Sequence, residues 1–508
     1  MRMNRAVGLF WILGVASAFA IGGCAKKESS APAVAAAAAE PTPAGGGKIP
    51  VTTSSAEAKA EFLQGREMFE KLLITDSIAH FQKAVSLDPN FAWAELDLAN
   101  SAPTGKEFFE HLNEAVSLAG KASNGEKLLI LAAQAGANNN AVKQKEYLDG
   151  LVAAYPNDER AHFNLAGYLF GQQDYPQAIE HYKKATELDP NYSTAYNLLG
   201  YAYRQSGDYA SAEKAFQRYI ELIPKDPNPY DSYAELLLKM GRFDDSIAQY
   251  RKALEINPNF LNAHQGIAMD LLYQGKSDQA AAELQNIAQK ARTDGERRTG
   301  LFALTVVYLD GGKMARALEN VDKQYALAEK TDNVPAMAFD RGLKGNILME
   351  MGKPDQARAE FEHGLKLIEG SNLSQEIKDN ARLVHHYNLA RVAAAKKDFA
   401  AAKSEADEFR KGAEASKNPA QAKNTHELDG IVALAEKDYN KAEAELLQAN
   451  QQNPQDLYRL CQAYQGKGEA GKAMDYCGKA ANFNSLPQVN YAFVRTKAKA
   501  SAGTAKAG

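Results

Sequence analysis

Residues 185–260 contain three similar segments, "ATELDPNY" (185–192), "IELIPKDP" (220–227) and "ALEINPNF" (253–260). Their prolines, Pro190, Pro224 and Pro258, follow one another at intervals of 34 residues. Small and large residues recur in step between these prolines, and proline ends a helix because it cannot continue one. The stretch Glu159–Phe260 therefore predicts one helical hairpin that is repeated three times.

The recurring small and aromatic residues have a packing role in these hairpins. Small residues let two antiparallel helices approach closely, and aromatic residues fill the space between one hairpin and the next. The positions that recur are Leu165-Ala166, Leu199-Gly200 and Tyr233-Ala234, then Ala178, Ala212 and Ser246, then Tyr182, Phe216 and Tyr250.

The middle hairpin closely resembles the tetratricopeptide repeat family. It contains Tyr196-x2-Leu199-Gly200-x2-Tyr203, followed by Ala212-x3-Phe216 and Pro224, and it departs from the family pattern by having tyrosine in place of tryptophan. The interval of 34 residues is the period of that family. The resemblance implies an all-α fold, an α-solenoid in which hairpins stack into a right-handed superhelix.

The repeat continues on both sides of this stretch. A hairpin with the same pattern is expected in "FLQGREMFEKLLITDSIAHFQKAVSLDPNF" (62–91), and beyond Arg292 the period lengthens to 40–45 residues. We expect about twelve hairpins in all. The last stretch, "LPQVNYAFVRTKAKA" (486–500), predicts a capping helix that solvates the open end of the array.

The pattern predicts five parts along the chain. They are a signal peptide (1–23), Cys24 with a disordered tether (24–55), an N-terminal array (56–292, with the sharpest repeats at 159–260), a C-terminal array of longer repeats (293–485), and the capping helix with a disordered tail (486–508).

The N-terminus predicts export and lipidation. Arg2 and Arg5 precede an apolar run from Ala6 to Ile21 that is short for a membrane span. The run ends in "IGGC" (21–24), which resembles a lipobox, so we expect a lipid on Cys24. An ordinary cleaved signal and an uncleaved anchor are the alternatives. Because Lys26 replaces an acidic retention residue, we expect the outer membrane and the periplasm rather than the inner membrane.

The composition and the motifs do not indicate an enzyme. Charged residues are 24% of the 508 residues and the formal net charge is −4, so we expect no nucleic-acid partner. The sequence contains no HExxH, GxSxG or Walker motif. His385 and His386 are adjacent and point about 100° apart on a helix, so they do not form a chelating pair. We expect no catalytic residue, metal or cofactor.

Cys461 and Cys477 occupy the positions that Gly200 and Phe216 hold in the middle hairpin. They would face each other across two packed helices, so a disulfide is expected in an oxidising compartment. The alternative is that both are small core residues. In either case their role is structural.

The resemblance implies that the first helix of each hairpin lines a concave groove. The candidate groove residues are Phe163, Phe170, Asn197, Tyr201, Arg204, Asp231, Glu235, Met269 and Tyr273. The alternative for each is an ordinary exposed or packing side chain. The dicarboxylate clamp of chaperone-binding family members is absent, because Phe163 and Gly167, or Asn197 and Tyr201, replace its lysine and asparagine.

These expectations favour a non-enzymatic scaffold lipoprotein that binds envelope proteins, as an extended peptide or a helix, in its groove. The alternative is a module that binds a glycan or a peptidoglycan fragment. Its platform would be formed by the aromatic rings of Phe163, Phe170, Tyr201 and Tyr273.

Overall fold

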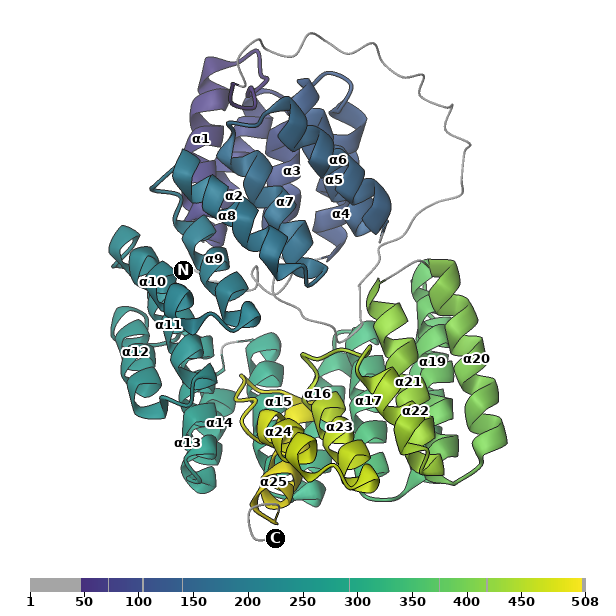
Figure 1. Cartoon of the computed structure of the whole chain (residues 1–508). Helices are drawn as coiled ribbons and strands as arrows, with labels where there is room; N and C mark the ends of the chain where they lie inside the picture. The colour runs from purple at the N-terminus through teal and green to yellow at the C-terminus, as the bar shows by residue number, and fades with distance from the viewer. Residues whose placement is uncertain are drawn as a thin grey trace. The chain divides into compact units, whose positions relative to one another are not determined.

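A computed structural model describes residues 47–504 except 72, 103–104, 139, 292, 374 and 417–418. Within these residues the chain forms 25 helices and no strand (Figure 1). Consecutive helices pair into twelve hairpins, from α1 with α2 to α23 with α24, and α25 follows alone. The predicted all-α solenoid of about twelve hairpins with a C-terminal helix is thus confirmed. The predicted signal peptide, Cys24 and most of the tether lie outside the described residues.

The contacts divide the chain into unit 1, which ends at Pro229, and unit 2, which begins at Tyr230. The helices of unit 1 are α1 (Ala56–Glu70), α2 (Ile74–Leu87), α3 (Ala92–Ser101), α4 (Gly105–Leu118), α5 (Asn124–Ala137), α6 (Ala141–Ala154), α7 (Glu159–Gly171), α8 (Tyr175–Leu188), α9 (Ser193–Ser206) and α10 (Tyr209–Leu222). The predicted boundary at residues 292 and 293 rests on repeat length and stays a prediction; α14 and α15 on its two sides pack against each other.

Unit 2 begins within α11 and contains the longer helices. These helices are α11 (Pro227–Lys239), α12 (Phe243–Ile256), α13 (Leu261–Tyr273), α14 (Ser277–Lys290), α15 (Asp294–Asp310), α16 (Met314–Glu329), α17 (Val334–Glu350), α18 (Pro354–Glu369), α19 (Gln375–Ala395), α20 (Phe399–Ser416), α21 (Pro419–Glu436), α22 (Tyr439–Leu446), α23 (Pro454–Lys467), α24 (Ala470–Ala481) and α25 (Val489–Thr504).

Small residues on the first helices allow close packing within the hairpins. A Cβ atom added to Gly200 would lie 2.7 Å from the ring of Phe216, closer than real side chains come. Between neighbouring hairpins the approach is closer still, because a Cβ atom added to Gly266 on α13 would lie 2.0 Å from the ring of Tyr250 on α12. The pairing of small and aromatic residues that the repeat pattern predicts is therefore a steric requirement of the fold.

A polar pair also joins the two helices of many hairpins. Its members are nineteen residues apart, one on each helix, and in four hairpins a histidine Nδ1 faces a glutamate oxygen at 2.5–2.8 Å. We call these contacts cross-hairpin pairs. They are Glu61 with His80, His264 with Glu283, His386 with Glu405, His426 with Glu445, and Arg341 with Glu360; at the same spacing, His162 faces His181.

Residues 48–55, here called the N-terminal strap, differ from the sequence prediction. The Ala-, Pro- and Gly-rich composition placed them in a disordered tether, but the structure places them on unit 1. Ile49 is buried, and its backbone N–H donates to Asp158. The composition-based prediction was wrong here because this part of the predicted tether carries apolar side chains that can be buried. The other contacts of the strap are Thr52 N–H to Glu126 at 2.8 Å and Thr53 Oγ1 to Asp88 at 2.6 Å.

The C-terminal helix contacts more of unit 2 than the last hairpin that it was predicted to cap. It packs on α23 and α24 of the last hairpin, as a cap does, but it packs on α15 as well (Figure 1). Four consecutive side chains, from Tyr491 to Val494, are buried in the largest apolar cluster of unit 2. The predicted capping helix is therefore confirmed, and its contact with α15 buries it on a second side, which needs apolar residues around most of its circumference.

Candidate functional site

We group the first helices of the hairpins as one side of each unit; several contact the next first helix, among them α1 with α3, α3 with α5 and α7 with α9 in unit 1, and α13 with α15 in unit 2. We call this side the first-helix face. In unit 1 it includes α1, α3, α5, α7 and α9, and in unit 2 it includes α11, α13, α15 and α17. The candidate groove residues lie on α7 and α9 of unit 1 and on α11 and α13 of unit 2.

On α7, two candidate aromatic residues pack within the array. The ring of Phe163 is half-buried, with its centroid 5.0 Å from that of Tyr192 and 5.8 Å from that of Tyr182. Phe170 is buried against Tyr175, at a centroid distance of 5.6 Å. These contacts are those of packing side chains, which was the alternative reading for each residue.

On α9, the three candidates form a partly buried group. Tyr201 is only 3% exposed and packs edge-on against Phe216, at 5.2 Å between ring centroids. The guanidinium of Arg204 lies 4.6 Å from the centre of the Tyr201 ring. Asn197 is buried, and its Oδ1 accepts no hydrogen bond from the part of the chain that the structure describes.

A cluster of charges that the sequence did not reveal lies on the first-helix face of unit 1. The guanidinium of Arg160 at the start of α7 pairs with Glu70 at the end of α1, with Nε and Oε1 2.8 Å apart. Ser193 and Thr194 donate hydrogen bonds to the carbonyl of Glu70. The end of α1 therefore lies against the starts of α7 and α9. The contacting residues are 90–124 positions apart in the sequence, so a pattern that repeats every 34 residues does not predict the contact.

Asp97 on α3 belongs to the same cluster. Burial raises the pKa of its carboxyl group to about 7, although the nearby charge of Arg66 acts in the opposite direction. The guanidinium of Arg66 also lies over the ring of Trp93, at 5.5 Å from the centroid. Buried carboxyl groups with such shifts occur at functional sites and also in structural ion networks, and this one lies within a network.

In unit 2, α11 carries the two acidic candidates. Asp231 is 3% exposed, and its Oδ1 accepts no hydrogen bond from any described residue. Burial and the charge of Glu235 one turn later raise the pKa of Asp231 well above its ordinary value. Glu235 is half-buried.

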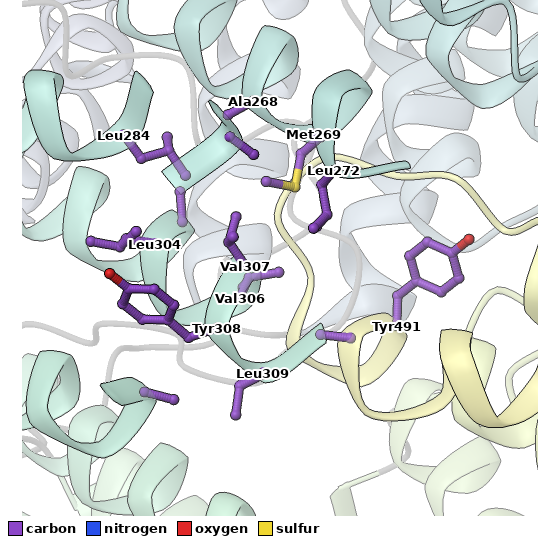
Figure 2. Packing of buried hydrophobic residues seen from close by; sticks show 14 of the residues in the cluster. Ala268, Met269, Leu272, Leu284, Leu304, Val306, Val307, Tyr308, Leu309 and Tyr491 are labelled. Carbon is purple, nitrogen blue, oxygen red and sulfur yellow. The ribbon is translucent and has the colours of Figure 1, made fainter. Parts of the chain in front are cut away.

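On α13, the two candidates are covered by the end of the chain. Met269 and Tyr273 are buried in the apolar cluster that includes Tyr491 and Val494 of α25. Figure 2 shows Met269 and Leu272 beside the yellow C-terminal segment and Tyr491 on the yellow helix. We call residues 482–504 the C-terminal segment. The sequence pattern did not mark this segment as part of a site, although it places Tyr491 and Arg495, an aromatic residue and an arginine, four residues apart on one helix.

The C-terminal segment also makes ionic contacts with the first helices. Arg495 forms a bidentate pair with Asp310 at the end of α15, with Nε and Oδ1 2.6 Å apart. The side chains of this pair are 8% and 4% exposed. Further out, Lys497 pairs with Glu350 at the end of α17 at 2.6 Å.

The two C-terminal cysteines lie as their spacing predicts. Cys461 on α23 and Cys477 on α24 are both buried, and their Cα atoms are 5.1 Å apart with the sulfur atoms bonded. That separation suits a disulfide. Whether the bond forms in the cell stays a prediction.

The described residues offer few places for small-molecule chemistry. They contain no group of three or more histidine, cysteine, aspartate or glutamate side chains that could hold a metal ion. A hollow of about 390 Å³ lies beside His162 and His181 in unit 1. Three of the four rings of the suggested glycan platform, Phe170, Tyr201 and Tyr273, are buried, so they present no stacking surface.

Within the described part of the chain, none of the helices combines the length and the apolar character that crossing a membrane requires.

Models of one protein family match the central part of the chain. Models described as tetratricopeptide repeat match residues 145–193, 168–227 and 227–260. A model described as tetratricopeptide repeat-like domain matches residues 264–381. No curated protein matches the chain at a significant level.

Several solved structures resemble parts of the chain. MamA is 24% identical and covers 32% of this chain and 98% of its own, with a TM-score of 0.29. A tetratricopeptide repeat protein from Parabacteroides merdae is 18% identical and covers 51% of this chain and 97% of its own, with a TM-score of 0.37. YrrB, described as a repeat protein with an unusual peptide-binding site, is 21% identical and covers 38% and 97%, with a TM-score of 0.26.

Proposed function

The chain is a tetratricopeptide repeat protein, and from this premise we propose that it is a non-catalytic scaffold that binds segments of partner proteins. The family models support a role in protein–protein interaction. The finer proposal is that the array binds an extended or helical segment on its first-helix faces. It includes a lipid anchor at Cys24, attachment to the outer membrane, and partners in the periplasm.

One observation carries the proposal. Both units hold a segment from outside the hairpins, and in each unit some of these contacts are made through the backbone of the segment. In unit 1, carboxylates accept backbone N–H groups of the N-terminal strap, as Asp158 does from Ile49 at 2.8 Å. In unit 2, Lys239 Nζ donates to the carbonyl of Phe483 at 2.6 Å. Backbone contacts do not depend on side-chain identity, so the same surfaces suit segments of other proteins.

Gly167 on α7 offers a way to block the first-helix face of unit 1 without disturbing the core. A Cβ atom there would lie 3.7 Å from its nearest neighbour, Tyr182 Oη, which is ordinary contact. Replacing a helix-interior glycine also favours the helix by about 1 kcal/mol. Gly471 on α24 is an exposed, matched control, since a Cβ there has no neighbour within 4 Å.

The test is crosslinking in cells with the full chain, followed by identification of the attached proteins. If the proposal holds, Gly167→Arg loses partners that the wild type and the control Gly471→Arg both retain. An unchanged set of partners in Gly167→Arg would remove unit 1 from the proposal. For the anchor, Cys24→Ser should move the protein from the membrane fraction to the soluble fraction, and continued membrane fractionation contradicts lipidation.

A further inference from the structure

The C-terminal segment contacts unit 2 in the way that a bound peptide contacts a receptor. Its first part, before α25, is not helical, and two of its backbone carbonyls accept hydrogen bonds from side chains of first helices. Lys239 on α11 donates to Phe483, and Tyr273 Oη on α13 donates to Ser485 at 2.5 Å. These contacts hold the backbone of the segment, and the centre of the Phe483 ring also lies 3.7 Å from Lys239 Nζ and packs against Tyr491.

The helical part of the segment adds two side-chain anchors. The ring of Tyr491 packs against Tyr273, at 5.5 Å between centroids. Arg495, one turn later, pairs with the buried carboxylate of Asp310, and its guanidinium lies 5.3 Å from the centre of the Tyr273 ring. Residues four apart lie on one face of a helix, so both anchors point at the same surface.

The surface under the segment has a definite chemistry. It has a cation, Lys239, where the extended part enters, and apolar side chains such as Met269 in the middle. Asp310 is 4% exposed at the side chain and needs a cationic partner, because an unpaired buried carboxylate is costly. Glu350 provides a second, more exposed acid at the far end.

α25 also stands apart from the repeat itself. The other 24 described helices form hairpins, whereas α25 has no second helix and follows α24 through residues 482–488. It continues no hairpin pattern; it packs on α23 and α24 of the last hairpin and also on α15, which is far away in the sequence. Its position is that of a segment that docks on the array.

We propose that the first-helix face of unit 2, formed by α11, α13, α15 and α17, is a helix-binding site that holds the C-terminal segment as a ligand in cis and accepts a partner helix in its place. The partner segment carries an aromatic residue, an arginine four residues later that pairs with Asp310, and a basic residue two further on that pairs with Glu350. This inference rests on the proposed function only in assuming that first-helix faces bind protein segments.

The test uses the full chain with a protease site inserted between Ala481 and Asn482, where α24 ends. After cleavage, the probe is a fluorescent synthetic peptide of residues 482–504, and the matched control is the same peptide with Tyr491→Ala and Arg495→Ala. We expect the labelled peptide to replace the cleaved fragment on the folded protein. We expect the doubly substituted peptide to bind at least about tenfold more weakly, as loss of two central anchors implies.

The proposal is overturned if the cleaved fragment does not exchange, or if its departure unfolds α11 to α24 as seen by circular dichroism. If the inserted site prevents folding, hydrogen exchange on the unaltered chain decides instead. A docked segment can detach while the rest of the array stays folded, so amides in α25 should exchange with solvent at least about tenfold faster than those in α15. Equal exchange in the two helices would make α25 part of the core and would end the proposal.

This test and the crosslinking test fail separately. Gly167→Arg alters unit 1 and leaves the peptide-exchange result untouched, because the peptide binds residues of unit 2. Peptide exchange without partners in cells would contradict the proposed function alone, and partners without peptide exchange would contradict the docked-segment inference alone.

Discussion

The N-terminal strap on unit 1 and the C-terminal segment on unit 2 bind the array by opposite chemistry. The strap donates backbone N–H groups to carboxylates near the starts of first helices, such as Glu126 and Asp158. The C-terminal segment offers carbonyls to donors, places Tyr491 in the apolar cluster, and pairs Arg495 with Asp310. The difference shows that one repeat architecture can hold either an extended or a helical segment, according to the side chains on its first helices.

The charged contacts of the two units differ in burial as well. In unit 1, the side chains of Arg160 and Glu70 are 16% and 20% exposed, so water still screens their attraction. In unit 2, Arg495 and Asp310 are almost fully enclosed. Removal of one partner should therefore cost much more in unit 2 than in unit 1.

Trp93 makes the units separable in experiments. The chain has two tryptophans, Trp11 and Trp93. In protein produced without residues 1–23, tryptophan fluorescence therefore follows unit 1, whereas circular dichroism follows both units.

The largest effect is expected for Asp310→Ala. It leaves the buried guanidinium of Arg495 without a counter-charge, which should lower the free energy of unfolding of unit 2 by about 3–5 kcal/mol. Urea unfolding followed by circular dichroism measures this, while the Trp93 transition should not move. Asp310→Leu combined with Arg495→Met should recover much of the loss. A shift of the Trp93 transition of equal size would contradict the separation of the units.

Reduction of the C-terminal disulfide is expected to have the next largest effect. The bond between Cys461 and Cys477 closes a loop with a sequence separation of 16 residues, so its loss should cost unit 2 about 3 kcal/mol. Residues 47–229 contain no cysteine, so a reducing agent should leave the Trp93 transition unchanged. The control is the double variant Cys461→Ser, Cys477→Ser. Its stability should not change with reductant and should be lower than that of the oxidised wild type.

Asp97 should give unit 1 a pH dependence of its own. Burial raises its pKa to about 7, above the ordinary 3.8, so between about pH 4 and pH 7 the folded unit binds a proton that the unfolded chain releases. The free energy of unfolding should therefore fall as the pH rises through this window. Asp97→Asn should remove that fall and raise the stability at pH 8 by about 2 kcal/mol, with little change at pH 4. Identical pH profiles of variant and wild type, measured through Trp93, would rule this out.

The smallest effect is expected in the N-terminal strap. Thr53→Val removes the hydroxyl that donates to Asp88 at 2.6 Å and should cost unit 1 about 1 kcal/mol. Thr52→Val is the matched control, because Thr52 uses its backbone N–H, which the substitution retains. Both values come from urea unfolding followed by Trp93 fluorescence. Equal effects of the two substitutions would show that the strap contributes through apolar contact instead.

Repeat reasoning predicted the hairpins well and the ends of the chain poorly. The match of Gly200 with Phe216 follows from local sequence, since both residues belong to one 34-residue unit. The contact of Glu70 with Arg160, and that of Asp310 with Arg495, join residues 90 and 185 apart. Such pairs depend on how the hairpins stack, which no single repeat encodes. For the same reason, the repeat pattern gave no sign that the C-terminal segment covers Met269 and Tyr273.

The cross-hairpin pairs have a consequence for how such an array can change in length. Both members of each pair, for example His386 with Glu405, belong to one hairpin. Duplication or loss of a whole hairpin therefore leaves every such pair intact, whereas a recombination point inside a hairpin separates two partners. We therefore expect that gene rearrangements with recombination points between hairpins are retained more often than those with recombination points inside a hairpin. Each hairpin that has a polar pair carries both of its members.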